Sequence, residues 1–139
     1  MVIPDGWKAL PVAGLWSAIG PLLARRDGEG WIYGLATDDR HANPIGLIHG
    51  GTLTALMDHA MTLVAFAACD RTPALTVQME TRFLSAARPG DLLVARSTLD
   101  RRAGTTLFLS CRVGSGETVV AAGSALMKLR PERKEDKDG

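Results

Sequence analysis

The sequence of 139 residues has little cysteine and almost no net charge. Its two cysteines, Cys69 and Cys111, form no CxxC pair, which is typical of a reduced cytoplasmic chain. Sixteen basic and fifteen acidic residues leave a formal charge of +1, so there is no basic excess to bind nucleic acid. The apolar runs are too short to cross a bilayer and the N-terminus lacks a signal-peptide pattern. We therefore expect a cytoplasmic protein without nucleic-acid or membrane partners.

Several motifs of common enzyme classes are also absent. The GxSxG motif of serine hydrolases does not occur. Neither do the GxGxxG and GxxxxGK[ST] phosphate loops. The histidines His41, His49 and His59 do not have metal-ligand spacing with each other or with the cysteines. We expect no metal and no cofactor, and we interpret His41 and His59 as loop and helix-surface residues.

The remaining sequence predicts one domain over residues 1–130, followed by a charged and disordered tail at 131–139. A short helix at 7–18, interrupted by Pro11, is expected first. A hairpin of 20–26 and 31–37 follows, and further strands are expected at 75–83, 92–99, 105–113 and 118–130. Alternation in the first of these strands predicts that Leu75, Val77, Met79 and Phe83 share one face.

The strongest predicted element is a helix at about residues 51–69. Residues 52–69 contain no glycine or proline, and apolar residues fall on nearly every side, which predicts a helix buried all round. A curved sheet is the only material left to enclose it. We therefore predict the α+β class, with an antiparallel sheet wrapped around a central helix.

Gly50 and Gly51 immediately precede this helix. The first N–H groups of a helix lack internal partners and carry the positive end of its dipole. This favours a site for a developing oxyanion. The alternative is that the two glycines simply make the turn.

Asp58 lies in the middle of the apolar helix, with Thr54 and Thr62 one turn to either side. A carboxylate is costly to bury unless it is used or paired. A catalytic role and a structural hydrogen bond to a neighbouring group are therefore both open. Asp58 is eight residues after Gly50, which corresponds to about 12 Å along one helix. The two groups of one chain cannot reach the same carbonyl, so if both are catalytic, they come from two subunits.

Asn43 and His49 are the other polar candidates near the glycines. The Asn43 amide could donate to a carbonyl or hold a water, although Asn-Pro also favours a turn. His49 could polarise a carbonyl, but we favour a role in fixing the loop.

These residues together resemble the signature of the PaaI-type hotdog thioesterases, the group related to phenylacetic acid degradation. The pattern reads Asn43, Gly46, His49, Gly50, Gly51 and then Asp58, and the resemblance covers about residues 15–130. It implies a hotdog fold, a homodimer or homotetramer, and an acyl-CoA substrate in which coenzyme A belongs to the substrate. It also implies that the Gly50 N–H stabilises the oxyanion, that the partner's Asp58 is nucleophile or general base, and that Asn43 positions the carbonyl or water. His49, Gly51 and Thr76 are expected to contribute to substrate binding.

Two other functions remain open at this point. A hotdog enoyl-CoA hydratase or dehydratase would need a histidine paired with a carboxylate. A non-catalytic acyl-CoA-binding module would bind the ester without turnover. The acyl group is not readable from the sequence.

Overall fold

The computed structural model describes residues 2–130, so the predicted tail at 131–139 lies outside the described residues. The elements, in chain order, are β1 (Lys8–Leu10), α1 (Leu15–Ile19), β2 (Leu22–Asp27), β3 (Gly30–Ala36), η1 (Asp39–His41), α2 (Gly50–Ala68), β4 (Ala74–Phe83), β5 (Leu92–Ala103), β6 (Thr106–Ser115) and β7 (Thr118–Leu129). The predicted hairpin, long helix and four later strands are therefore all present.

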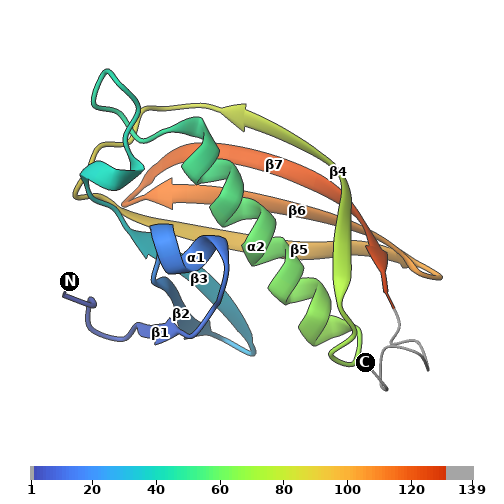
Figure 1. Ribbon diagram of the computed structural model, residues 1–139. Coiled ribbons are helices and arrows are strands. Elements are labelled where there is room, and N and C mark those ends of the chain that lie inside the picture. The colour runs from blue at the N-terminus through green and yellow to red at the C-terminus, as the bar shows by residue number, and fades with distance from the viewer. Residues whose placement is uncertain (1, 131–139) are drawn as a thin grey trace.

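The strands form one antiparallel sheet in the order β1-β2-β3-β5-β6-β7-β4. The long helix α2 lies across one face of this sheet. The short helix α1 lies beside it, over strands β2 and β3 (Figure 1). β4 follows α2 in the chain but pairs with β7, so it forms the far edge of the sheet. The predicted class, an antiparallel sheet wrapped around one central helix, is confirmed.

The N-terminal prediction of a helix at 7–18 is wrong. Residues Lys8–Leu10 pair with β2 as a strand, and the helix is confined to Leu15–Ile19. Pro11 separates the two, and Gly14 has a φ of 76° at the start of α1. That left-handed backbone conformation is easily adopted by glycine and interrupts a regular helix.

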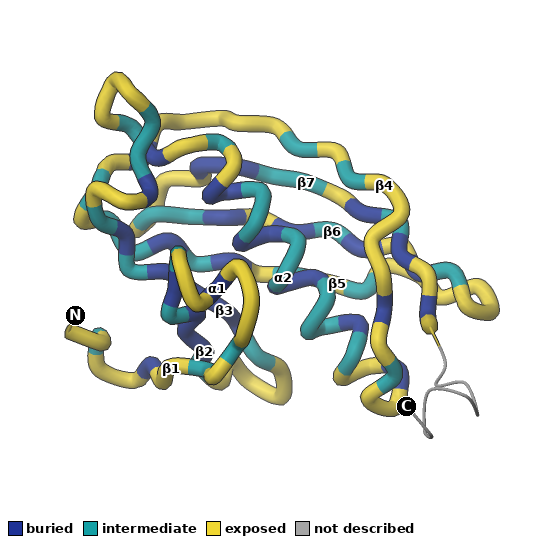
Figure 2. The backbone as a smooth tube through the Cα atoms, viewed as in Figure 1, coloured by how far each residue is buried: buried dark blue, intermediate teal, exposed yellow. Residues whose placement is uncertain are grey.

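α2 is buried on one face rather than all round. Its buried positions recur three and four residues apart and pack onto the sheet: Leu53, Leu56, Met57, Ala60, Met61 and Ala65. The opposite side is intermediate or exposed within a single chain (Figure 2). α2 is long and apolar enough to cross a membrane, with a mean hydropathy of 1.2 over 18 residues, although the sequence analysis predicts no membrane-crossing segment. The core helix of a globular domain has the same length and composition, and α2 packs on the sheet.

A β-bulge in β4 overturns the predicted pattern of its faces. The register with β7 shifts between Thr76 and Gln78, which makes Val77 the extra residue. Thr76 bonds to the helix side chain of Asp58, Met79 packs against the core, and Phe83 contacts Gly50. Leu75, the neighbour of Thr76, therefore points to the opposite face and is 54% exposed. The bulge turns a threonine from the predicted polar face toward α2.

Candidate active site at the two ends of strand β4

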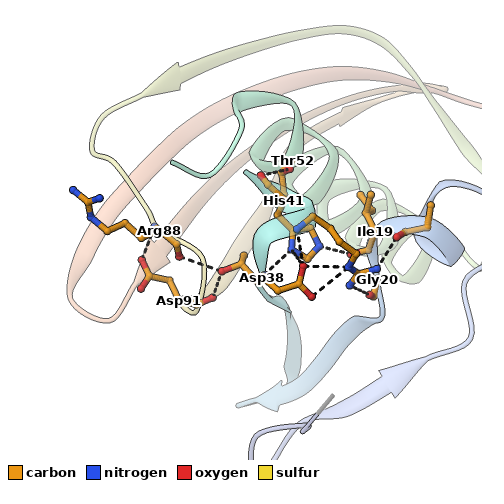
Figure 3. A network of polar contacts seen from close by, with 10 residues as sticks. Ile19, Gly20, Asp38, His41, Thr52, Arg88 and Asp91 are labelled. Carbon is orange, nitrogen blue, oxygen red and sulfur yellow. Dashed lines mark hydrogen bonds and ion pairs between the residues drawn. The ribbon is translucent and has the colours of Figure 1, made fainter. Parts of the chain in front are cut away.

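The loop before α2 is organised around a buried histidine, His41, which is only 1% exposed. Its Nδ1 accepts from the Asp38 N–H at 2.9 Å, so Nε2 carries the proton and donates to the Ile19 carbonyl at 2.6 Å. The His41 carbonyl accepts from the Thr52 hydroxyl at 3.2 Å, as Figure 3 shows. His41 thus links η1, α1 and the first turn of α2 from a buried position in the segment that we interpreted as a loop.

An exposed ion pair reinforces the same loop. Arg40 bonds to Asp38 through its Nε at 3.1 Å and donates to the Ala18 and Gly20 carbonyls at 2.7 and 3.1 Å. The bonds from Arg40 lower the pKa of the Asp38 carboxyl. The contacts fix the loop against the end of α1 (Figure 3).

His49 caps the N-terminus of α2. Its Nδ1 accepts from the Gly51 N–H at 2.7 Å, and a Cβ at Gly51 would stand 3.0 Å from this nitrogen. The Gly51 N–H is therefore occupied, and the His49 side chain caps the helix. In contrast, the Gly50 N–H has no partner within residues 2–130. The first turn, residues 50–53, carries no acidic side chain to offset the dipole.

A pocket of about 390 Å³ opens beside the Gly50 end of the helix. Asn43, Gly50 and Leu53 line it together with Phe83 and Leu84, which lie at the end of β4. The Asn43 Oδ1 accepts from the Ile45 and Leu47 N–H groups at 3.1 and 3.0 Å, so this side chain organises the turn. Its amide nitrogen has no partner in the described part of the chain, which leaves two N–H donors available. Asn43 therefore has the turn role, while its role toward a carbonyl or a water stays a prediction.

The Phe83 ring packs against Gly50 at the start of α2. A Cβ on Gly50 would stand 3.0 Å from the Phe83 ring, so the absence of a side chain lets the ring pack on the helix. Phe83 itself is 55% exposed. This contact was missed from the sequence because Gly50 and Phe83 are 33 positions apart and no local pattern relates them.

Asp58 lies at the other end of β4. The Thr76 hydroxyl donates to Asp58 Oδ1 at 2.5 Å. The Thr62 hydroxyl donates instead to the Asp58 carbonyl at 2.8 Å. The carboxylate is thus held by one hydroxyl from β4, and its second oxygen has no hydrogen-bond partner within residues 2–130.

The adjacent His59 was also missed as part of this region, because we interpreted it as a surface residue. Its ring meets the Trp16 ring edge to face at 5.7 Å and is of intermediate exposure. Burial lowers the pKa of His59, although the neighbouring Asp58 charge opposes this effect. Burial therefore favours the neutral form of the ring.

The arrangement in one chain is two half-sites. One half-site has the Gly50 N–H, which has no partner within residues 2–130, and the other has the Asp58 carboxylate bonded to Thr76. They are separated by two turns of the same rigid helix, about 12 Å. Chemistry that needs both halves at one carbonyl requires a second chain.

Comparisons with known proteins identify the family of this fold. The family model of the thioesterase superfamily matches residues 45–122, which include Gly50, Asp58 and Thr76. A Pseudomonas aeruginosa protein named "putative esterase" is 32% identical over 132 residues, covering 93% of this chain and 98% of its own. Human acyl-coenzyme A thioesterase 13 is 26% identical over 76 residues, 55% of this chain and 54% of that protein. The structure of a phenylacetic acid degradation-related protein from Ralstonia eutropha superposes with a TM-score of 0.76 at 25% identity, covering 86% and 92% of the two chains.

Proposed function

Because this chain belongs to the thioesterase superfamily and has its hotdog fold, we propose that it hydrolyses acyl-CoA thioesters to free CoA and a carboxylic acid. The observation that carries the proposal is the pair of half-sites, an unpartnered Gly50 N–H at a helix N-terminus and the Asp58 carboxylate bonded to Thr76. The printed name of the human relative, an acyl-coenzyme A thioesterase, supports the substrate class.

In the proposed reaction the thioester carbonyl oxygen accepts from the Gly50 N–H, and the Asn43 amide positions the carbonyl or the water. Asp58 of the partner subunit removes a proton from the attacking water, or attacks the carbonyl carbon itself to give an anhydride that water then opens. Negative charge builds on the carbonyl oxygen beside the helix N-terminus, where the dipole stabilises it. The C–S bond breaks, CoA leaves as the thiolate, and the proton taken from water ends on the thiolate or in solvent. Thiolate is a good leaving group, so no strong general acid is required.

The edge strand β4 gives a physical reason for two chains. It is ten residues long, and the strand order leaves one of its sides unpaired. Leu75, Val77 and Phe83 are each more than half exposed on it. A long apolar edge of this kind is a template for pairing with another chain. We therefore propose a homodimer built by antiparallel pairing of two β4 strands, with a tetramer as a dimer of dimers.

Such pairing would bring the half-sites together. Thr76, which holds Asp58, lies near the start of β4, and Phe83, which covers Gly50, lies at its end. If two β4 strands pair antiparallel about a centre between Met79 and Glu80, Thr76 of each chain faces the Phe83 end of the other. Each composite site would then contain one chain's Gly50 and Asn43 with Asp58 of the partner subunit.

The direct test measures free CoA release from aryl and straight-chain acyl-CoAs by wild type and Asp58→Asn. Turnover in the wild type that falls by orders of magnitude in the variant supports the proposal. No release from any thioester, with tight ester binding, would favour an acyl-CoA-binding module. Water addition to an enoyl-CoA would favour a hydratase.

A complementation experiment tests the shared site. Asp58→Asn and Gly50→Pro chains, each expected to be strongly impaired alone, are refolded together. A mixed dimer would contain one site with an intact Gly50 N–H and an intact Asp58, so activity should return. A mixture that stays inactive, despite mixed dimers seen by native mass spectrometry, would refute the shared site.

We further propose that the enzyme acts in the cytoplasm and uses no metal or cofactor.

A further inference from the structure

A second pocket, also of about 390 Å³, lies on the other side of α2. It is lined by the C-terminal half of the helix and by strands β1, β2 and β3. Leu63, one of its lining residues, follows Asp58 by five positions and is therefore about 140° further around the helix. The helix itself separates this pocket from the Asp58–Thr76 half-site.

The walls of this pocket are aromatic. Trp31, Tyr33 and Phe66 line it, with Leu10 and Leu63 beside them. The strand register aligns Lys8, Ala24 and Tyr33 in one row across three strands. The small Ala24 between the two longer side chains leaves the floor of the pocket open. A flat or flexible apolar group has the right character to fill it.

Three cations surround the aromatic walls. Lys8 Nζ and the Arg26 guanidinium lie 4.9 and 5.3 Å from the centre of the Trp31 ring, and Arg71 lies 5.6 Å from that of Phe66. Within residues 2–130, none of the three has a carboxylate within 4.0 Å. The pocket therefore joins an apolar interior to an uncompensated positive rim.

Tyr33 adds a polar group inside the pocket. The residue is only 7% exposed, and its hydroxyl has no hydrogen-bond partner in the described part of the chain. The only fully buried polar side-chain atom without a partner there is Ser97 Oγ, so the Tyr33 hydroxyl reaches the open space of the pocket. Burial raises the pKa of Tyr33, which keeps the phenol a neutral donor. The hydroxyl therefore faces the pocket, where it can donate to a ligand acceptor.

Arg71 is held in place by an unusual backbone. Asp70 and Arg71 follow α2 with φ values of 53° and 60°, and the Arg71 N–H donates to the Phe66 carbonyl at 2.8 Å. Glycine would adopt this left-handed conformation without strain, whereas other residues are disfavoured there. Strain retained at a charged residue beside a pocket is typical of a functional position.

From these features we propose that this pocket binds an apolar carboxylate, an aryl or alkyl acid. The hydrocarbon part lies between Trp31, Tyr33 and Phe66. The carboxylate lies at the positive rim, where Lys8 and Arg71 pair with it and the Tyr33 hydroxyl donates to it. The site is distinct from the proposed thioesterase site and does not depend on it.

The test is isothermal titration calorimetry of the full chain with octanoate and 4-phenylbutyrate, and with the matched neutral amides. Each acid should bind saturably and at least about tenfold tighter than its amide, because charge-assisted bonds to the rim are lost in the amide. Lys8→Gln and Arg71→Gln should each weaken acid binding roughly tenfold. Tyr33→Phe, which removes a single hydroxyl, should weaken it about fivefold.

Two variants serve as controls. Arg25 lies 4.9 Å from the Trp7 ring, in the separate hydrophobic cluster that Trp7 forms with Leu23 and Ile32. Arg25→Gln removes a comparable cation and should leave acid binding unchanged. Asp58→Asn should also bind the acid like wild type.

Three results would overturn the inference. The first is equal binding of acid and amide, or no saturation below about 10 mM. The second is an equal loss of affinity in Arg25→Gln and Arg71→Gln. The third is loss of acid binding in Asp58→Asn, which would place the acid in the thioesterase site. No arm measures thioester turnover, so failure here is distinguishable from failure of the proposed function.

Discussion

The backbone N–H of Gly50 can be deleted selectively by Gly50→Pro. Gly50 is the first residue of α2, a position where proline is well tolerated because its missing N–H has no helical partner. The preceding residue, His49, has a ψ of 137°, which is the extended conformation that a following proline requires. Loss of one oxyanion donor typically lowers kcat by about 10²–10³-fold. We expect a loss of that size, with KM changed much less.

Proline also adds a Cβ, which would stand 3.0 Å from the Phe83 ring. Gly50→Ala adds the same atom and keeps the N–H, so it is the matched control. We would measure kcat and KM from free CoA release for both variants, and thermal unfolding to confirm that both are folded. If folded Gly50→Pro and Gly50→Ala have kcat values within about threefold of each other, the Gly50 N–H is not the oxyanion donor.

Three further predictions follow from other contacts. Thr76→Val removes the bond to Asp58, worth about 1.5–3 kcal/mol for a charged acceptor, and should lower kcat roughly tenfold or more. Thr76→Ser keeps a hydroxyl, so its kcat should stay near that of wild type. Equal kcat values for the two variants would contradict an orienting role. Arg71→Gly should relieve about 1 kcal/mol of left-handed strain and raise Tm by about 3 °C in a melting scan, whereas a lower Tm would show that the side chain contributes more to stability than the strain costs. Burial lowers the pKa of His59 below its ordinary 6.5, so the stability it contributes is present above that value and is lost as pH falls through the folded pKa. The decrease in melting temperature from pH 7.5 to about pH 5 should therefore be smaller in His59→Gln than in wild type. An equal decrease in both proteins would show that His59 is not the group responsible.

Local sequence patterns were sufficient for most elements of this fold. The hairpin, α2 and the four later strands were predictable because turn residues, helix formers and strand alternation act over a few positions. The N-terminal prediction failed because strand β1 is stabilised by pairing with β2, whose paired residues are 12 to 16 positions away. The polar residues at the helix N-terminus were also identifiable, since free N–H groups follow from where a helix begins.

The sequence by itself determined a sheet around an apolar helix and a helix N-terminus that favours an anion. It also determined that Asp58 lies too far along that helix to reach a carbonyl bound at the N-terminus of the same chain. The tertiary structure alone decided which neighbours these groups have. The bulge at Val77 turns Thr76 toward Asp58, the β4–β7 pairing leaves β4 as an edge, and Phe83 returns to cover Gly50. The aromatic pocket with Tyr33 likewise joins residues 8–33 with residues 63–71. These contacts depend on packing between distant segments, and periodicity in a sequence reports the direction of a side chain without reporting what it meets.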